Sequence, residues 1–145
     1  GLVENWRTEW GIGDFSFFYC QIAPYDYGVS GMNSAFLREA QYNASMALPN
    51  MGMACLMDVG EKTCIHPADK EAAGERLAYL ALSKTYGIKG FEFSGPKLDK
   101  MTVEGSVVKL TFRHAKNGLT TFGKELKNFK VAGENKRFFD VLSQL

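Results

Sequence analysis

The sequence predicts an α/β fold, in which a partial parallel sheet with helices is followed by a small antiparallel β region. In the first half of the chain, short apolar runs alternate with stretches of helical periodicity. An order of strand, helix, strand and helix implies parallel strands in an α/β layer. After Gly87 the pattern changes to an alternation of period two with frequent glycines, which is typical of antiparallel strands.

The first half contains two predicted strands and two predicted helices. Residues 15–23 form a nearly continuous apolar run, as in a strand buried on both faces, and 51–57 form a second run. Apolar residues recur at helical spacing over 32–47. Pro67 suits the first turn of a second helix, where its missing N–H costs nothing, and Gly87 ends that helix.

The second half contains a predicted hairpin and further short strands. Residues 101–104 and 107–112 alternate in polarity and are joined by a tight turn at Gly105. The further strands are expected at 119–122, 129–131 and 138–141. We therefore expect 1–87 to be part of an α/β domain and 88–145 to be part of an antiparallel, sandwich-like domain.

Length, composition and charge exclude several classes of protein. The chain has 145 residues, of which 46% are hydrophobic and 23% charged, so it is neither disordered nor fibrous. No apolar run approaches the ~20 residues that span a bilayer. The net charge of +1 divides into −4 over residues 1–86 and +5 over 87–145. Because no nucleic-acid-binding motif accompanies the basic half, we expect no nucleic-acid partner.

The cysteines point to neither a disulfide framework nor a zinc site. Cys20, Cys55 and Cys64 are odd in number and far apart, and we expect no metal and no cofactor. Cys20 and Cys55 lie in apolar runs, which predicts buried thiols. The N-terminus lacks the segments of a signal peptide. The compartment stays open, because a longer parent could be exported with free thiols.

The predicted sheet is thin. Two parallel strands leave at least one long apolar edge without a partner, and a bare edge promotes association. We expect either a second copy of the chain or an upstream segment of a longer parent to cover that edge.

Polar residues follow both predicted strands. Ligand sites in α/β sheets lie at the carboxyl ends of the strands, which here are 21–27 and 58–66. Tyr25 and Tyr27 follow the first strand and could line a sugar-sized pocket, although plain packing is also compatible with them. The second loop contains Asp58, Glu61, Cys64 and His66.

His66 is the candidate general base. It directly precedes the predicted helix, whose positive end favours the neutral imidazole that a base needs. The alternative is that His66 caps the helix or lies free on the surface. Asp58 and Glu61 could orient the imidazole or be solvated carboxylates. Cys64 is a weaker candidate nucleophile, because nucleophile and base usually come from distant segments.

Short motifs follow one another in a fixed order along nearly the whole chain and resemble a known family. They are Trp6-Arg7, Trp10, Gly13-Asp14-Phe15, Gln21-Ile22-Ala23-Pro24-Tyr25, Leu37-Arg38-Glu39-Ala40-Gln41, Pro49-Asn50-Met51-Gly52-Met53-Ala54, Asp58-Val59-Gly60-Glu61, Ile65-His66-Pro67-Ala68-Asp69-Lys70, Gly74-Glu75-Arg76-Leu77-Ala78, Lys84-Thr85-Tyr86-Gly87, Ser94-Gly95-Pro96, Gly118-Leu119 and Phe129-Lys130-Val131-Ala132-Gly133-Glu134. In this order they resemble the sialate O-acetylesterase family of SGNH-type hydrolases.

The resemblance implies a flavodoxin-like sheet and a hydrolase that removes O-acetyl groups from sialic acid or related sugars. Such enzymes use a serine nucleophile, a histidine base and commonly an acidic partner. His66 matches the family's histidine in its Ile-His-Pro context. It would take the serine proton and later protonate the leaving sugar oxygen.

The sequence departs from the family at two places. The family's serine stands in a Gly-Gln-Ser-Asn motif that this chain lacks, and Ser30, Ser34 and Ser45 stand in other contexts. Many relatives carry Asp where Cys64 stands, which leaves Asp58 and Glu61 as candidates for the acidic partner. We therefore expect a C-terminal fragment of the catalytic domain with the start of the β region, inactive by itself.

Two other classes of function remain open on the sequence. One is a glycan-binding module without catalysis, which would hold a sugar against Tyr25 and Tyr27. The other is a structural subunit that completes the sheet of another chain.

Overall fold

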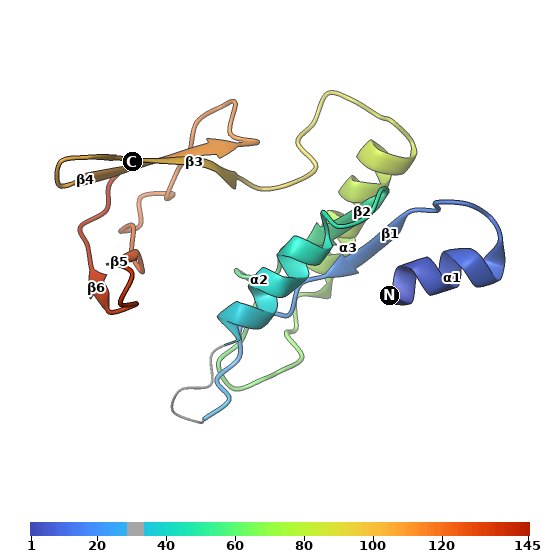
Figure 1. Ribbon diagram of the computed structural model, residues 1–145, viewed down its shortest axis with the longest axis horizontal. Helices are drawn as coiled ribbons and strands as arrows, with labels where there is room; N and C mark the ends of the chain where they lie inside the picture. The colour runs from blue at the N-terminus through green and yellow to red at the C-terminus, as the bar shows by residue number, and fades with distance from the viewer. Residues whose placement is uncertain (29–33) are drawn as a thin grey trace. The chain divides into compact units, whose positions relative to one another are not determined.

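The computed structural model describes residues 1–28 and 34–145. Residues 29–33 lie outside the described residues, and they include Ser30 and the first two residues of the helix predicted at 32–47. The chain divides into two compact units, Gly1–Gly95 and Pro96–Leu145 (Figure 1). The assignment of 1–87 and 88–145 to parts of two domain types stays a prediction.

The first unit has the predicted parallel sheet. Its elements are α1 (Leu2–Trp10), β1 (Phe17–Cys20), α2 (Ala35–Ala44), β2 (Met51–Ala54), α3 (Lys70–Leu80) and the π-helix η1 (Ala81–Thr85). β1 and β2 pair in parallel, from Phe17 opposite Met51 to Cys20 opposite Ala54. This confirms the α/β fold class. Among the described residues the two strands pair only with each other, so each keeps one unpaired edge.

Both strands are shorter than the apolar runs predicted at 15–23 and 51–57. The last backbone hydrogen bond between them runs from the Gln21 N–H to the Ala54 carbonyl. Only alternate residues of a parallel strand donate to the same neighbour, so the Ile22 N–H points away from β2, and it donates to the Gln41 side chain of α2. The apolar run therefore overstates the strand by several residues.

α2 and α3 cover opposite faces of the sheet. The Tyr19 hydroxyl donates to a backbone carbonyl of α2. On the other face, a side chain at Gly52 would meet both Phe18 and Leu80, the last residue of α3. Since adjacent residues of a strand point to opposite faces, Phe18 and Tyr19 place the two helices on either side. This three-layer order is the one that doubly wound folds use.

The N-terminal helix α1 packs on the α2 side of the sheet. The ring of Trp6 lies 5.7 Å from that of Phe17, which shares a face with Tyr19, and it stacks on Trp10 at 5.6 Å. The helix ends at Gly11, which adopts a left-handed conformation with φ of 63°. Such a conformation suits glycine, because it has no Cβ to clash.

A buried arginine ties α1 to the segments that precede both strands. Arg7 is 8% exposed, and its Nη2 donates to the Phe15 carbonyl at 2.7 Å and to the Pro49 carbonyl at 2.8 Å. Its Nη1 lies 3.5 Å from a carboxylate oxygen of Asp14. A buried guanidinium with charged and carbonyl acceptors is a strong connection. Arg7 therefore fixes the amino ends of the sheet.

The core of the first unit is small. Its buried apolar residues are Val3, Met51, Ala54, Leu56 and Leu80. Cys20 is half-buried, but the expectation of a buried Cys55 was wrong, because β2 ends at Ala54 and Cys55 lies exposed beyond it. No helix among the described residues is long and apolar enough to span a membrane.

The helix predicted to begin at Pro67 begins three residues later, at Lys70. Asp69 is its N-cap, and the Asp69 carboxylate accepts from the Ala72 N–H at 2.9 Å. A capping carboxylate satisfies one of the free N–H groups at a helix start, and this capping competes successfully with the preference of proline for the first turn. His66 is therefore outside the first turn of α3.

The second unit consists of two hairpins. β3 (Lys97–Glu104) pairs antiparallel with β4 (Val107–Arg113), and the two-residue loop begins at Gly105, whose φ is 59°. This confirms the predicted hairpin. β5 (Lys130–Ala132) pairs antiparallel with β6 (Phe138–Asp140), close to the short strands expected at 129–131 and 138–141.

The strand predicted at 119–122 was wrong. That segment forms no ladder, because it bends twice over a few residues. The Thr120 hydroxyl accepts from the Phe122 N–H at 3.0 Å, and Phe122 itself has a φ of 50°. A hydroxyl that bonds the backbone two residues on forms a turn in place of a strand.

Candidate active site

The loops that leave β1 and β2 lie against each other at the carboxyl ends of the strands. A Cβ at Gly60 would come within 2.4 Å of the Pro24 carbonyl oxygen, so the two backbones are in direct contact. The Asp26 N–H donates to the Lys62 carbonyl at 3.1 Å. These contacts bring the residues predicted after each strand to one end of the sheet, as the parallel order requires.

His66 lies exposed in the loop after β2. The Cys64 thiol donates to the His66 carbonyl at 3.1 Å, and the imidazole makes no hydrogen bond within residues 1–28 and 34–145. Since α3 begins only at Lys70, His66 does not directly precede the helix as the sequence predicted. The role of His66 as general base stays a prediction that rests on the family resemblance.

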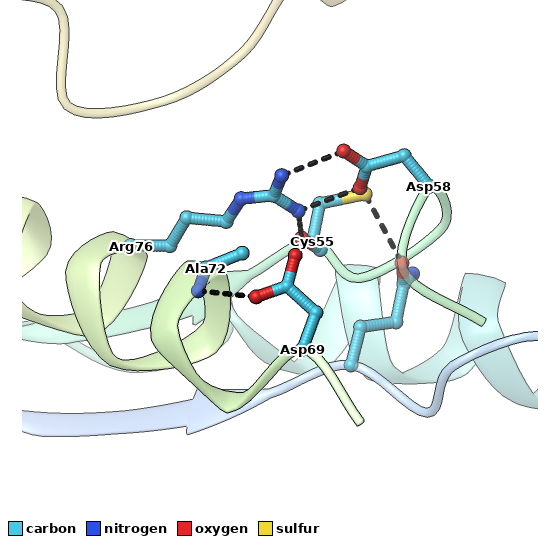
Figure 2. Close-up of polar contacts among 6 residues, drawn as sticks. Cys55, Asp58, Asp69, Ala72 and Arg76 are labelled. Carbon is cyan, nitrogen blue, oxygen red and sulfur yellow. Dashed lines mark hydrogen bonds and ion pairs between the residues drawn. The ribbon is translucent and has the colours of Figure 1, made fainter. Parts of the chain in front are cut away.

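Asp58 is bound to α3 (Figure 2). Its two carboxylate oxygens accept from Nη1 and Nη2 of Arg76, each at 2.6 Å. The Arg76 guanidinium holds the pKa of Asp58 below its ordinary value, and the same hydrogen bond raises the pKa of Arg76. Asp58 is therefore ionised in a forked ion pair, the strongest geometry available to these two groups.

Glu61 closes the segment that contains His66. Its Oε1 accepts from the Ala68 N–H at 2.6 Å, so a carboxylate joins residues seven apart and the segment 61–68 becomes a closed loop. Both oxygens of Asp58 and one oxygen of Glu61 are thus engaged with groups other than the His66 ring. The orienting role predicted for the two carboxylates stays a prediction.

Tyr25 and Tyr27 form a pair beside this loop. Their rings meet edge to face, with centroids 5.0 Å apart and an angle of 86° between the planes. Both are half-buried. Between them, the Asp26 carboxylate accepts from the Gly28 N–H at 2.9 Å and so tightens the turn. The pair presents partly exposed aromatic surface, which is the kind of surface that contacts sugar rings.

Sequence reasoning missed two polar residues at this end of the sheet, Gln21 and Arg76. Gln21 is 7% exposed, accepts from the Cys55 thiol at 3.4 Å and donates from Nε2 to the Arg38 carbonyl of α2 at 3.2 Å. The signal for Gln21 in the sequence was a polar residue directly after an apolar strand. Arg76 gave none, because its partner Asp58 is 18 residues away.

Within the described parts of the chain, no three His, Cys, Asp or Glu side chains gather in a way that could hold a metal ion.

The described residues also form a shallow hollow of about 380 Å³ between α1, the end of α2 and Met51. Met51 begins β2, so this hollow lies at the amino end of the sheet, away from His66.

Comparison with known proteins shows an informative similarity among solved structures. No protein-family model matches this sequence, and no curated protein is significantly similar to it. Among solved structures, a carbohydrate acetylesterase from Xanthomonas citri superposes with a TM-score of 0.80 at 29% sequence identity. The chain is similar to part of a carbohydrate acetylesterase. The match covers 99% of this chain and 34% of that esterase, so the chain spans about a third of the esterase's length.

This similarity supports the resemblance at the level of carbohydrate esterases. It extends over both compact units, since 99% of the chain is matched. The order of α/β layer and antiparallel hairpins is therefore shared with part of that carbohydrate acetylesterase.

Proposed function

We propose that this chain is part of a carbohydrate esterase that hydrolyses O-acetyl esters of sialic acid or related sugars. The observation that carries the proposal is the superposition on a carbohydrate acetylesterase over 99% of the chain. The sialic acid substrate and the SGNH type come from the ordered motifs around His66. The chain would supply the catalytic histidine, and the serine nucleophile would come from a segment outside these 145 residues.

The proposed reaction is acyl transfer followed by hydrolysis. His66 would remove the proton of the serine hydroxyl as that oxygen attacks the acetyl carbonyl. It would then return the proton to the leaving sugar oxygen, and would activate a water molecule to release acetate. The exposed loop position of His66 fits this role, because its ring is free to meet a group on another segment.

The substrate would lie beside Tyr25 and Tyr27. The pair is half-buried and lies in the loop that contacts the His66 loop through Gly60. An edge-to-face pair offers one ring face and one ring edge to a sugar, whose C–H groups pack on such faces. The same pair is the observation behind the second candidate, a glycan-binding module without catalysis.

The test replaces the matching third of the Xanthomonas citri esterase with this chain. We expect the chimera to release acetate from O-acetylated sialic acid, His66→Ala to abolish the release, and His114→Ala to leave it unchanged. The 145-residue chain alone should release none. A chimera that retains full activity with His66→Ala would overturn the proposal.

The same experiment tests the substrate class and the alternative function, a glycan-binding module without catalysis. Faster turnover of O-acetylated sialic acid than of an acetylated xylose would support the sialate substrate. Affinity of the unmodified chain for the sugar, lost in a Tyr25→Ala/Tyr27→Ala double variant and accompanied by an inactive chimera, would favour the glycan-binding module instead.

A further inference from the structure

Arg76 joins α3 to both sides of the bend by which the chain leaves β2. Its Nη1 donates to the Cys55 carbonyl at 2.6 Å, and its Nη1 and Nη2 donate to Asp58, also at 2.6 Å (Figure 2). Cys55 is the first residue after β2 and Asp58 is three residues further along. One side chain of a helix thus fixes the direction in which the loop starts.

The loop that begins there is long and has no regular structure of its own. It extends from Cys55 to Asp69. Its middle is held by the contact of Gly60 with Pro24 and by the hydrogen bond from Asp26 to Lys62. Most of its residues are exposed, so buried apolar contacts contribute little to its order.

The position of His66 depends on contacts that lie before and after it along the chain. The Glu61 carboxylate closes the segment 61–68, and the hydrogen bond from the Asp26 N–H to the Lys62 carbonyl joins this segment to the loop after β1. Its following anchor is the Asp69 cap on α3, and its preceding anchor is the Arg76–Asp58 pair. The segment that contains His66 is therefore anchored to α3 on both sides.

We propose that Arg76 is a positioning residue for His66, which acts through Asp58 and the Cys55 carbonyl to hold the His66 loop in one place against α3. The catalytic meaning of this placement rests on the proposed function. The hydrogen bonds from Arg76 also lower the pKa of Asp58, which favours the ionised carboxylate in the pair. The orienting role predicted for Asp58 is then exerted through the loop and not by contact with the imidazole.

The forked contact with Asp58 also explains why arginine is needed at position 76. Lysine at this position would keep the positive charge, but a single ammonium lacks the planar fork that bonds both oxygens of a carboxylate. Arg76→Lys is thus a variant that retains the charge while it loses the forked contact. Arg113→Ala is the matched control, because it removes another exposed ion pair, the one with Asp99 at 3.1 Å.

The first experiment uses the 145-residue chain and measures hydrogen exchange of single backbone amides by NMR. The reporters are the amides of Ala68 and Asp26, whose acceptors lie in the loop. We expect Arg76→Ala to accelerate hydrogen exchange at both amides by about tenfold or more. Arg76→Lys should give an intermediate exchange rate, and Arg113→Ala should leave the exchange rate unchanged. Unchanged exchange within α1 shows that the variants are folded. Unchanged exchange at both reporters in folded Arg76→Ala would overturn the inference.

The second experiment separates positioning from stability and from the proposed function. In the esterase chimera, Arg76→Lys should lower kcat by roughly tenfold to a hundredfold with KM nearly unchanged, since a misplaced base slows the chemical step and not binding. An equal loss in the Arg113→Ala chimera would contradict positioning. If His66→Ala leaves the chimera active, the proposed function fails, while the exchange result still decides whether Arg76 holds the loop.

Discussion

Gly60 lies directly against Pro24, and this contact allows the loops after β1 and β2 to meet. A methyl group there would stand 2.4 Å from the Pro24 carbonyl oxygen and 2.5 Å from the Pro24 ring. Backbone and proline ring atoms cannot turn aside as the end of a flexible side chain can. The requirement for glycine at this position is therefore steric, since its φ is not in the left-handed region.

Gly60→Ala should destabilise the first unit by about 1–3 kcal/mol, because the two loops must separate to admit the methyl group. The matched control is Gly74→Ala, where the added methyl group meets nothing within 4 Å and the helix gains stability of about 0.5–1 kcal/mol. Urea unfolding followed by tryptophan fluorescence measures both. An unaltered midpoint for Gly60→Ala would contradict the close contact.

The ion pair of Asp58 with Arg76 makes stability depend on pH. Because Arg76 lowers the pKa of Asp58 in the folded state, the contribution is present above the unfolded pKa and is lost as pH falls through the folded one. Asp58→Asn should lower the free energy of unfolding at neutral pH by up to about 1 kcal/mol, since the pair is exposed. The difference from the parent chain should vanish in acid.

Urea titrations of the parent chain and Asp58→Asn over a series of pH values measure this difference. Glu9→Gln on α1 is the control, because the Glu9 side chain makes no hydrogen bond or ion pair among the described residues. A penalty for Asp58→Asn that persists unchanged at low pH would show that the ion pair is not its source.

At the level of elements, α3 connects the sheet to the candidate site. Its end packs on the strands through Leu80, its middle holds the β2 loop through Arg76, and its start is capped by Asp69 next to the His66 segment. These three attachments lie at the end, the middle and the start of one helix. The cap is the attachment that can be altered without touching the core.

Asp69→Ala should cost about 1 kcal/mol of stability, because the Ala72 N–H loses its acceptor at the helix start. Asp69→Ser retains a side-chain oxygen at the cap and should cost only a few tenths of a kcal/mol. Thermal unfolding followed by circular dichroism compares the two. Equal losses for both variants would show that the cap bond is not what stabilises α3.

The elements were predictable where local patterns decide them. Two apolar runs and the helical spacing between them were sufficient for parallel strands, and Gly105 was sufficient for the hairpin turn. The start of α3 was not predictable from Pro67 alone, because the Asp69 cap prevailed. α1 was not predicted at all, although Gly11 offered a C-cap signal.

The candidate site was only partly predictable. The sequence placed His66, Asp58 and Glu61 in one loop, and they are there. It could not show that the two carboxylates bond to Arg76 and to the Ala68 N–H. Asp58 and Arg76 become neighbours only when α3 folds back over the end of β2, and no spacing within a single segment encodes that.

At the level of the whole molecule, burial is uneven. The buried residues belong to the first unit, and residues 96–145 contain none, while side chains such as Phe122 remain 87% exposed. In the part of the chain that the structure describes, β1 and β2 each also keep one unpaired edge. An unpaired strand edge can pair with another polypeptide. Covering of the edge by a second copy or by a further segment of a parent protein stays a prediction.

Leu80→Ala should therefore be far more costly than Leu142→Ala. Leu80 is 3% exposed, and its truncation should cost about 2–5 kcal/mol, whereas Leu142 is fully exposed and its truncation should change stability by less than about 0.5 kcal/mol. Both tryptophans of the chain, Trp6 and Trp10, lie in the first unit, so their fluorescence follows its unfolding. Similar midpoints for the two variants would contradict a core centred on that unit.

Arg7 has a consequence for strand alignment. The two carbonyls that its Nη2 bridges belong to Phe15 and Pro49, which stand two residues before the paired Phe17 and Met51. A slip of either strand by one residue would carry one carbonyl out of reach and would turn every side chain of that strand to the other face. Arg7 thus favours a single alignment of these two short strands, which share only four pairs of residues.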